Sequence, residues 1–139
     1  MRLFLDTSVL LSASASARGA SREVCRRAVA EGWTLVTTPY AIEEVLRHLP
    51  DFPSAASADW AKLRPALLIM DDALTRELPA GFAASKDKPI LFGALAWADV
   101  LLTLDRSDFG PLLDSTFYGL AVLTPGAFLQ RERTAGRIK

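Results

Sequence analysis

Two short apolar segments, each followed directly by an aspartate, limit what this chain can fold into more than any other feature. Leu3–Leu5 runs into Asp6, and Val100–Leu104, which is apolar apart from Thr103, runs into Asp105. Continuous apolar runs of this length are typical of strands buried in a parallel sheet. Ligands bind such sheets beyond the carboxyl ends of the strands, so we expect both aspartates at that edge. Asp99 precedes its strand and is expected at the opposite edge.

Strands and helical stretches alternate along the rest of the chain. Further strands are expected at Thr34–Thr37, Leu67–Met70 and Leu120–Leu123. Helices are expected over Thr7–Ala17, Ser21–Glu31, Pro39–His48, Ala58–Leu63 and Asp87–Ala98. This alternation predicts an α/β fold, a three-layer α/β/α sandwich whose central, mostly parallel sheet has four to five strands. The 139 residues, without repeats, predict one domain over residues 1–139, with residues 131–139 as a basic C-terminal tail.

Composition narrows the class of protein. Half of the residues are apolar, which argues against disorder, and no apolar run approaches the roughly 18 residues of a membrane span. Cys25 is the only cysteine and cannot form an internal disulfide. Met1–Leu5 lacks the basic and long apolar stretches of a secretory signal. We therefore expect a cytoplasmic protein that does not contact a membrane.

Carboxylates are the chemical groups that the sequence offers for catalysis. The one histidine, His48, lies between Arg47 and Leu49 on an expected helix, where a surface position is the simpler interpretation. Phosphate-binding glycine loops and cysteine–histidine zinc spacings are absent from the sequence. Clustered carboxylates repel one another unless a cation neutralises them, and oxygen ligands suit Mg²⁺ or Mn²⁺. Such an ion can polarise a phosphodiester and activate water.

Four segments in the same order resemble the PIN-domain family of ribonucleases. They are MRLFLDTSVLLSA, TTPYAIEEVLRHL, KDKPILFGALAWADVLLTLDRSDF and YGLAVLTPGAFLQR. The first resembles the family's opening strand and aspartate, and the second its glutamate-bearing helix. The third resembles an aspartate at a helix start, then a strand and Thr-x-Asp, and the fourth resembles the closing strand and helix. Each motif is weak alone, but together they span nearly the whole chain.

The resemblance implies an acidic catalytic site. It assigns catalysis to Asp6, Glu44, Asp87 and Asp105, with the three aspartates as ligands of Mg²⁺ or Mn²⁺. Glu43 remains an alternative to Glu44, and Asp108 an outer ligand or a substitute for Asp105. Ser8 and Thr103 are expected to hold carboxylates or waters by hydrogen bonds. Asp71 and Asp72, the main rivals, are expected at the surface.

Each assignment has a simpler structural alternative. Asp87 is an ordinary helix N-cap, Asp105 to Asp108 fit a turn, and the two glutamates fit a solvated helix face. The resemblance further implies an RNA substrate, which predicts that basic side chains bind the phosphates: Arg22, Arg26, Arg131 and Arg133. Solvated surface is the alternative for these cations, because 16 basic residues balance 16 acidic ones.

The resemblance predicts a metal-dependent endoribonuclease, a toxin of the VapC kind that an antitoxin protein neutralises. It also implies a homodimer, since many relatives of this size form pairs. A PIN-like module that binds RNA or protein without cutting is the main alternative. A haloacid-dehalogenase-like phosphatase would need an aspartate where Ser8 stands. A receiver-like domain would need an acidic neighbour for Asp6 and a lysine after Leu123, where Thr124 follows.

Overall fold

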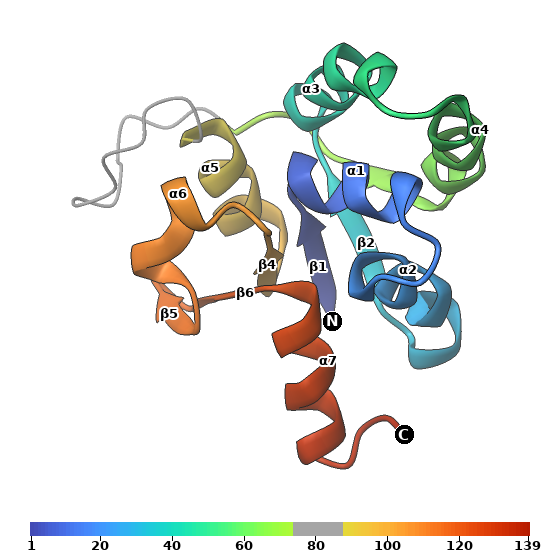
Figure 1. The fold of residues 1–139 in the computed structure, drawn as a ribbon. Coiled ribbons are helices and arrows are strands. Elements are labelled where there is room, and N and C mark those ends of the chain that lie inside the picture. The colour runs from blue at the N-terminus through green and yellow to red at the C-terminus, as the bar shows by residue number, and fades with distance from the viewer. Residues whose placement is uncertain (74–87) are drawn as a thin grey trace.

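The computed structural model describes residues 1–73 and 88–139. These residues form a six-stranded sheet that is surrounded by helices (Figure 1). The strands are β1 Arg2–Leu5, β2 Thr34–Thr37, β3 Leu68–Ile69, β4 Val100–Leu102, β5 Ser115–Phe117 and β6 Leu120–Leu123. The helices are α1 Thr7–Ala15, α2 Ala20–Glu31, α3 Pro39–His48, α4 Ser54–Leu63, α5 Lys88–Trp97, α6 Arg106–Phe109 and α7 Pro125–Thr134. Short 3₁₀ turns follow α3, α4 and α6, at Leu49–Asp51, Arg64–Ala66 and Gly110–Leu112.

The strands lie in the order β3-β2-β1-β4-β6-β5, and every neighbouring pair except β5–β6 is parallel. The prediction of a mostly parallel sheet is confirmed, but its size was underestimated. The additional strand, β5, is a mostly exposed edge strand without the continuous apolar run that marks the others. It pairs with β6 through a tight turn in which Tyr118 and Gly119 both have positive φ, 50° and 82°. Turns of this kind match the twist of a two-stranded hairpin.

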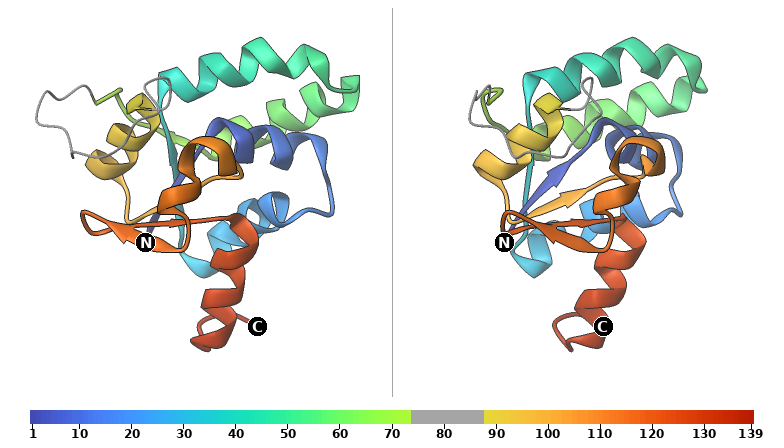
Figure 2. Two further views of the ribbon diagram at one scale, coloured as in Figure 1. Left: turned by 60° about the vertical axis from the view of Figure 1, so that its left-hand side comes forward. Right: turned by 90° about the vertical axis from the view of Figure 1, so that its left-hand side faces the viewer.

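Helices cover both faces of the sheet, as the views in Figure 2 show. Helix α5 packs on β1, β2 and β4 from one face. Helices α1, α2 and α7 occupy the other, where Trp33 and Phe128 meet edge to face with centroids 4.9 Å apart. Helix α1 also contacts α3 and α4, which lie beyond the carboxyl ends of the strands in Figure 1.

Glycine allows one of these helices to approach the central strand closely. A Cβ on Gly93 of α5 would lie 3.1 Å from the Phe4 ring of β1 and 3.1 Å from Cγ2 of Thr38. The central strand itself is fully buried, since Leu3, Phe4 and Leu5 all have 0% exposure. Burial on both faces explains why β1 appears in the sequence as an unbroken apolar run.

The C-terminal residues depart from the expected basic tail. Residues 131–134 form the last turn of α7, and Ile138 is buried among core side chains. The Glu132 side chain is buried and accepts hydrogen bonds from Arg137 and Arg131. This segment is therefore part of the fold, because burial of apolar and paired charged groups fixes it. Over the ranges described, no helix is long and apolar enough to cross a lipid bilayer.

Candidate active site

Asp6 is a buried carboxylate at the junction of β1 and α1. Its backbone N–H continues the sheet by donating to the Leu102 carbonyl of β4 at 3.1 Å. Its side chain is the N-cap of α1 and accepts a 2.7 Å hydrogen bond at Oδ1 from the Thr7 backbone N–H. Asp6 has only 4% exposure, so it lies where the end of a central strand meets the start of a helix, as its sequence position predicted.

Two hydroxyl groups hold the other oxygen of this carboxylate. Ser8 Oγ donates to Asp6 Oδ2 at 2.9 Å, and Thr103 Oγ1 donates to the same oxygen at 2.7 Å. Each hydroxyl also accepts from the loop after β4, Ser8 from the Leu104 N–H and Thr103 from the Asp105 N–H, both at 3.0 Å. These contacts fix the Asp6 carboxylate to the loop that carries Asp105, and they are of the kind predicted for Ser8 and Thr103.

Burial dominates the electrostatics of Asp6. Loss of hydration raises its pKa from 3.8 to about 6, although the hydrogen bonds from Thr103, Ser8 and Thr7 act to lower it. The charge of Asp105 adds to the increase. The protein therefore holds a buried anion whose ionised form is costly, and a cation beside it would remove that cost.

Asp105 follows β4 and has a structural role of its own. Its Oδ1 accepts hydrogen bonds from the backbone N–H groups of Ser107 and Asp108, both at 3.0 Å, and so caps α6. The turn expected as the simpler alternative is therefore present. Asp108 lies on α6, and its backbone is fixed to Asp105.

Glu44 reaches this site from a separate helix. The Thr7 hydroxyl donates to Glu44 Oε1 at 3.1 Å, which ties α3 to the start of α1. Glu44 is partly buried, whereas its neighbour Glu43 is exposed. The structure thus brings the second of the two glutamates, and not the first, to the Asp6 region. Thr7 was not among the predicted site residues, although its place between Asp6 and Ser8 was the available signal.

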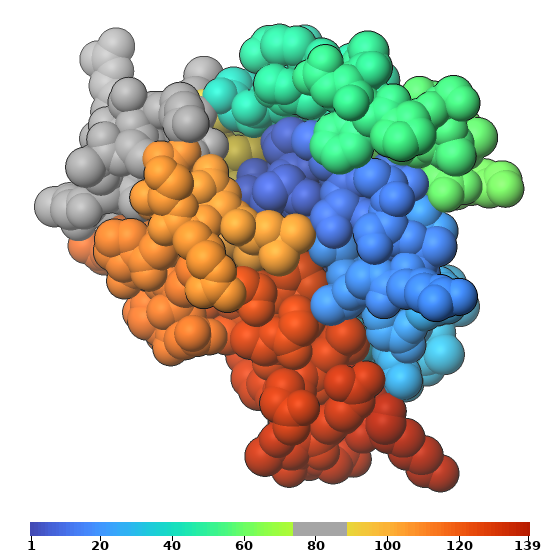
Figure 3. Space-filling view, in the orientation of Figure 1, coloured from blue at the N-terminus to red at the C-terminus, as the bar shows by residue number. Residues whose placement is uncertain are grey.

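The surface around this junction combines distant parts of the chain. In Figure 3 the deep-blue N-terminal residues lie between the orange segment that includes α6 and the teal surface of α3. Asp87, the remaining predicted ligand, lies outside the described residues, and α5 begins directly after it at Lys88. Among residues 1–73 and 88–139, no three acidic, histidine or cysteine side chains form a metal-binding group. The donors that do converge are carboxylate and hydroxyl oxygens, which fit Mg²⁺ or Mn²⁺.

Asp99 lies away from this junction, whereas Asp71 and Asp72 follow β3. Asp99 accepts a 2.7 Å hydrogen bond from the Arg2 backbone N–H at the opposite edge of the sheet, as predicted. Asp71 and Asp72 are exposed, also as predicted. Asp72 Oδ1 accepts from the Tyr40 N–H at 3.3 Å and thereby caps the helix that carries Glu44.

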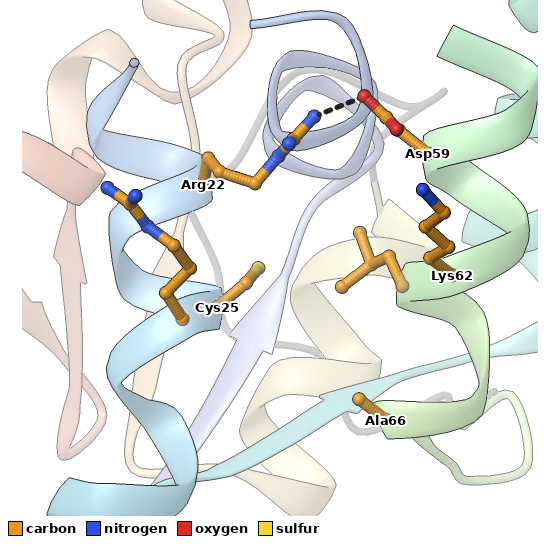
Figure 4. A pocket seen from close by; sticks show the side chains of 7 residues that line it. Arg22, Cys25, Asp59, Lys62 and Ala66 are labelled. Atoms are coloured by element: carbon orange, nitrogen blue, oxygen red, sulfur yellow. Dashed lines mark hydrogen bonds and ion pairs between the residues drawn. The ribbon is translucent and has the colours of Figure 1, made fainter. Parts of the chain in front are cut away.

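The cations predicted to bind RNA are not gathered at the carboxylates. Arg22 donates to the carbonyls of Ala13 and Ser14 at the end of α1, and to Asp59 of α4 at 2.9 Å (Figure 4). Arg26 remains 60% exposed and is paired with Glu23 on its own helix. Arg22 therefore joins three helices, a structural role that the spacing of the two arginines did not indicate.

Helix α7 directs its arginines away from Asp6. The Arg131 guanidinium lies 3.9 Å from the Met1 sulfur and over the Phe128 ring, and Met1 precedes β1 at the edge opposite Asp6. Arg133 is exposed on the same helix. Arg106, the exposed residue directly after Asp105, was not among the predicted RNA contacts although it adjoins the site in sequence.

Comparison with known proteins gives the fold class. No family model and no curated protein matches the sequence. Among solved structures, this chain is similar to one chain in the crystal structure of VapBC2 from Rickettsia felis, which is bound to a DNA fragment from the VapBC2 promoter. The TM-score is 0.62 at 14% identity, and the match covers 88% of this chain and 97% of that one. The likeness is one of fold, and it confirms the predicted α/β sandwich around a mostly parallel sheet.

Proposed function

We propose that this protein is a metal-dependent endoribonuclease that hydrolyses RNA phosphodiester bonds at the carboxyl edge of its sheet. The observation that carries the proposal is the buried Asp6 carboxylate, joined through hydroxyl groups to the Asp105 loop and through Thr7 to Glu44. A buried carboxylate with a raised pKa beside a second acidic group is typical of a functional site. The VapBC2 neighbour adds support from fold analogy.

The chain supplies oxygen ligands from three places. Asp6 and Asp105 would hold Mg²⁺ or Mn²⁺ together with Asp87, and the bound ion would supply charge to activate water and stabilise the leaving oxygen. Ser8 and Thr103 keep the Asp6 carboxylate in one orientation. Glu44, on its own helix, orients the attacking water. Arg106, which is exposed and directly follows Asp105, would contact a phosphate of the substrate.

The biological role that fits this activity is that of a VapC-like toxin. Its partner would be an antitoxin protein, and two copies of the chain would form a homodimer. The support is the family resemblance of the sequence together with the VapBC2 fold neighbour. Co-expression with the product of an adjacent small reading frame, followed by size-exclusion chromatography, tests both associations.

A cleavage assay tests the enzymatic proposal. The purified chain should cut single-stranded RNA with Mg²⁺ or Mn²⁺ and stop on chelation. Asp6→Asn and Asp105→Asn should each lower the rate by orders of magnitude while the fold remains intact. Asp99→Asn is the matched control, because Asp99 is an aspartate that precedes β4 at the opposite edge of the same sheet. Equal cleavage by Asp6→Asn and the wild type would refute the proposal.

A non-catalytic PIN-like module that binds RNA or protein is the second candidate. The equal numbers of basic and acidic residues, 16 of each, favour it, because a dedicated nucleic-acid-binding enzyme usually has a basic surplus. In that case RNA or a protein partner would bind with the same affinity before and after chelation. RNA would also remain uncut by the wild-type chain.

A further inference from the structure

Thr7 contacts both carboxylates that flank the start of α1. Its backbone N–H donates to Asp6 Oδ1 at 2.7 Å, and its hydroxyl donates to Glu44 Oε1 at 3.1 Å. The residue has only 8% exposure, so water does not readily replace these contacts. Thr7 is thus the place where β1, α1 and α3 are tied together by polar groups.

The hydroxyl of Thr7 is well suited to fix a longer side chain. A threonine is branched at Cβ and has few χ1 rotamers within a helix, so its hydroxyl direction is restricted. A glutamate has several free torsions and loses considerable conformational entropy when it is held in one position. Within the described residues, Thr7 is the donor that the structure shows for the Glu44 side chain. The Thr7 hydroxyl therefore restricts the conformations that the Glu44 side chain can adopt.

The two carboxylates depend on Thr7 in different ways. Asp6 receives its contact from the backbone, and Ser8 and Thr103 hold its other oxygen, so Asp6 would stay in place without the Thr7 hydroxyl. Glu44 receives its contact from the hydroxyl itself. Removing the hydroxyl alone should therefore release Glu44 and leave Asp6 fixed.

From this difference we infer that Thr7 is a positioning residue, whose hydroxyl group holds the Glu44 carboxylate beside the start of α1, where Asp6 lies. The inference rests on the proposed nuclease function, since it gives Glu44 the task of orienting the attacking water. Loss of the Thr7 hydroxyl should therefore slow the chemical step and leave RNA binding unchanged. Positioning partners of this kind change activity by about 10–100-fold when they are removed.

The test uses two substitutions at one position. Thr7→Val keeps the branched shape and removes the hydroxyl, whereas Thr7→Ser keeps the hydroxyl. Thr7→Val should lower kcat about tenfold with KM nearly unchanged, and Thr7→Ser should restore most of the loss. Thr116→Val, on the exposed edge strand β5, is the matched control and should cleave like the wild type. In a Glu44→Ala background, Thr7→Val should have little further effect.

A measurement without metal or RNA checks the contact directly. The side-chain carboxyl carbon resonance of Glu44 in the labelled full chain should move in Thr7→Val and stay near the wild-type position in Thr7→Ser. An unmoved resonance, or full activity of Thr7→Val in a protein whose cleavage requires Asp6, would overturn the inference and leave the proposed function standing. Equal losses in both variants would overturn it too, because the methyl group and not the hydroxyl would then matter. If the wild type cleaves no RNA, the proposed function fails, and the inference fails with it.

Discussion

Replacing Asp6 with asparagine should stabilise the metal-free protein, because it removes a charge that the fold has buried. Burial raises the pKa of this carboxyl from 3.8 to about 6. The difference of about 2 pKa units, at about 1.4 kcal/mol per unit, means that ionised Asp6 destabilises the native state by about 3 kcal/mol at neutral pH. An uncharged amide of the same size does not carry this cost.

Hydrogen bonding offsets part of the gain. The carboxylate accepts from Thr7, Ser8 and Thr103, and the amide NH₂ of asparagine cannot accept. The two hydroxyl groups can turn to accept from that NH₂, but the rearranged contacts are weaker, at a cost of about 1–2 kcal/mol. The net stabilisation is therefore about 1–2 kcal/mol, which for a chain of this length raises Tm by about 3–8 °C.

The stability difference between the wild type and Asp6→Asn should depend on pH, in a direction set by the raised pKa of Asp6. The folded chain binds a proton at Asp6 more tightly than the unfolded chain, so the wild type loses stability as pH rises from about 4 to about 6 and loses no more above that. Asp6→Asn lacks this loss. Differential scanning calorimetry in EDTA should show little or no advantage for the variant near pH 4 and the full advantage at pH 7.

Metal should reverse the order of the two proteins. Mn²⁺ at about 100 times its Kd would stabilise the wild type by about 2.7 kcal/mol, and it should stabilise Asp6→Asn much less. A Tm difference between the two proteins that is the same at pH 4 and pH 7 would refute the desolvation argument. A wild-type Tm indifferent to millimolar Mn²⁺ would refute the metal site.

Two further results are expected. Gly93→Ala should destabilise the protein by about 1–3 kcal/mol in thermal unfolding, because the added methyl would lie 3.1 Å from the Phe4 ring and push α5 from the sheet; an unchanged Tm would mean that α5 does not pack as closely as described. Arg106→Gln should weaken RNA binding and reduce the slope of log K against log salt by about one, as measured by fluorescence anisotropy across a salt series. Arg133→Gln should change neither quantity. A loss of RNA binding in Arg133→Gln but not in Arg106→Gln would place the RNA on α7.

Local patterns in the sequence were sufficient for the centre of the fold. A strand buried on both faces is mostly apolar, so β1, β4 and β6 could be recognised from their apolar runs and β2 from its β-branched residues. Because these strands are parallel, the aspartates that follow β1 and β4 had to share an edge, and Asp99 had to lie at the other. The edge strand β5 escaped recognition, since a short exposed strand has no such pattern.

The roles of individual polar groups depended on contacts between residues far apart in the chain. Helical periodicity does not distinguish Glu43 from Glu44, although the family resemblance favoured Glu44. The packing of α3 on α1 is what brings Glu44 to Thr7. Arg22 and Arg26 look alike on their helix, yet only Arg22 meets the end of α1 and Asp59. Local composition was sufficient to indicate which strands are buried, and the alternation of strands with helices was sufficient to indicate a parallel sheet whose acidic groups share one edge. Which carboxylate meets which hydroxyl depends on how the helices pack, because a hydrogen bond requires atoms within about 3 Å of each other.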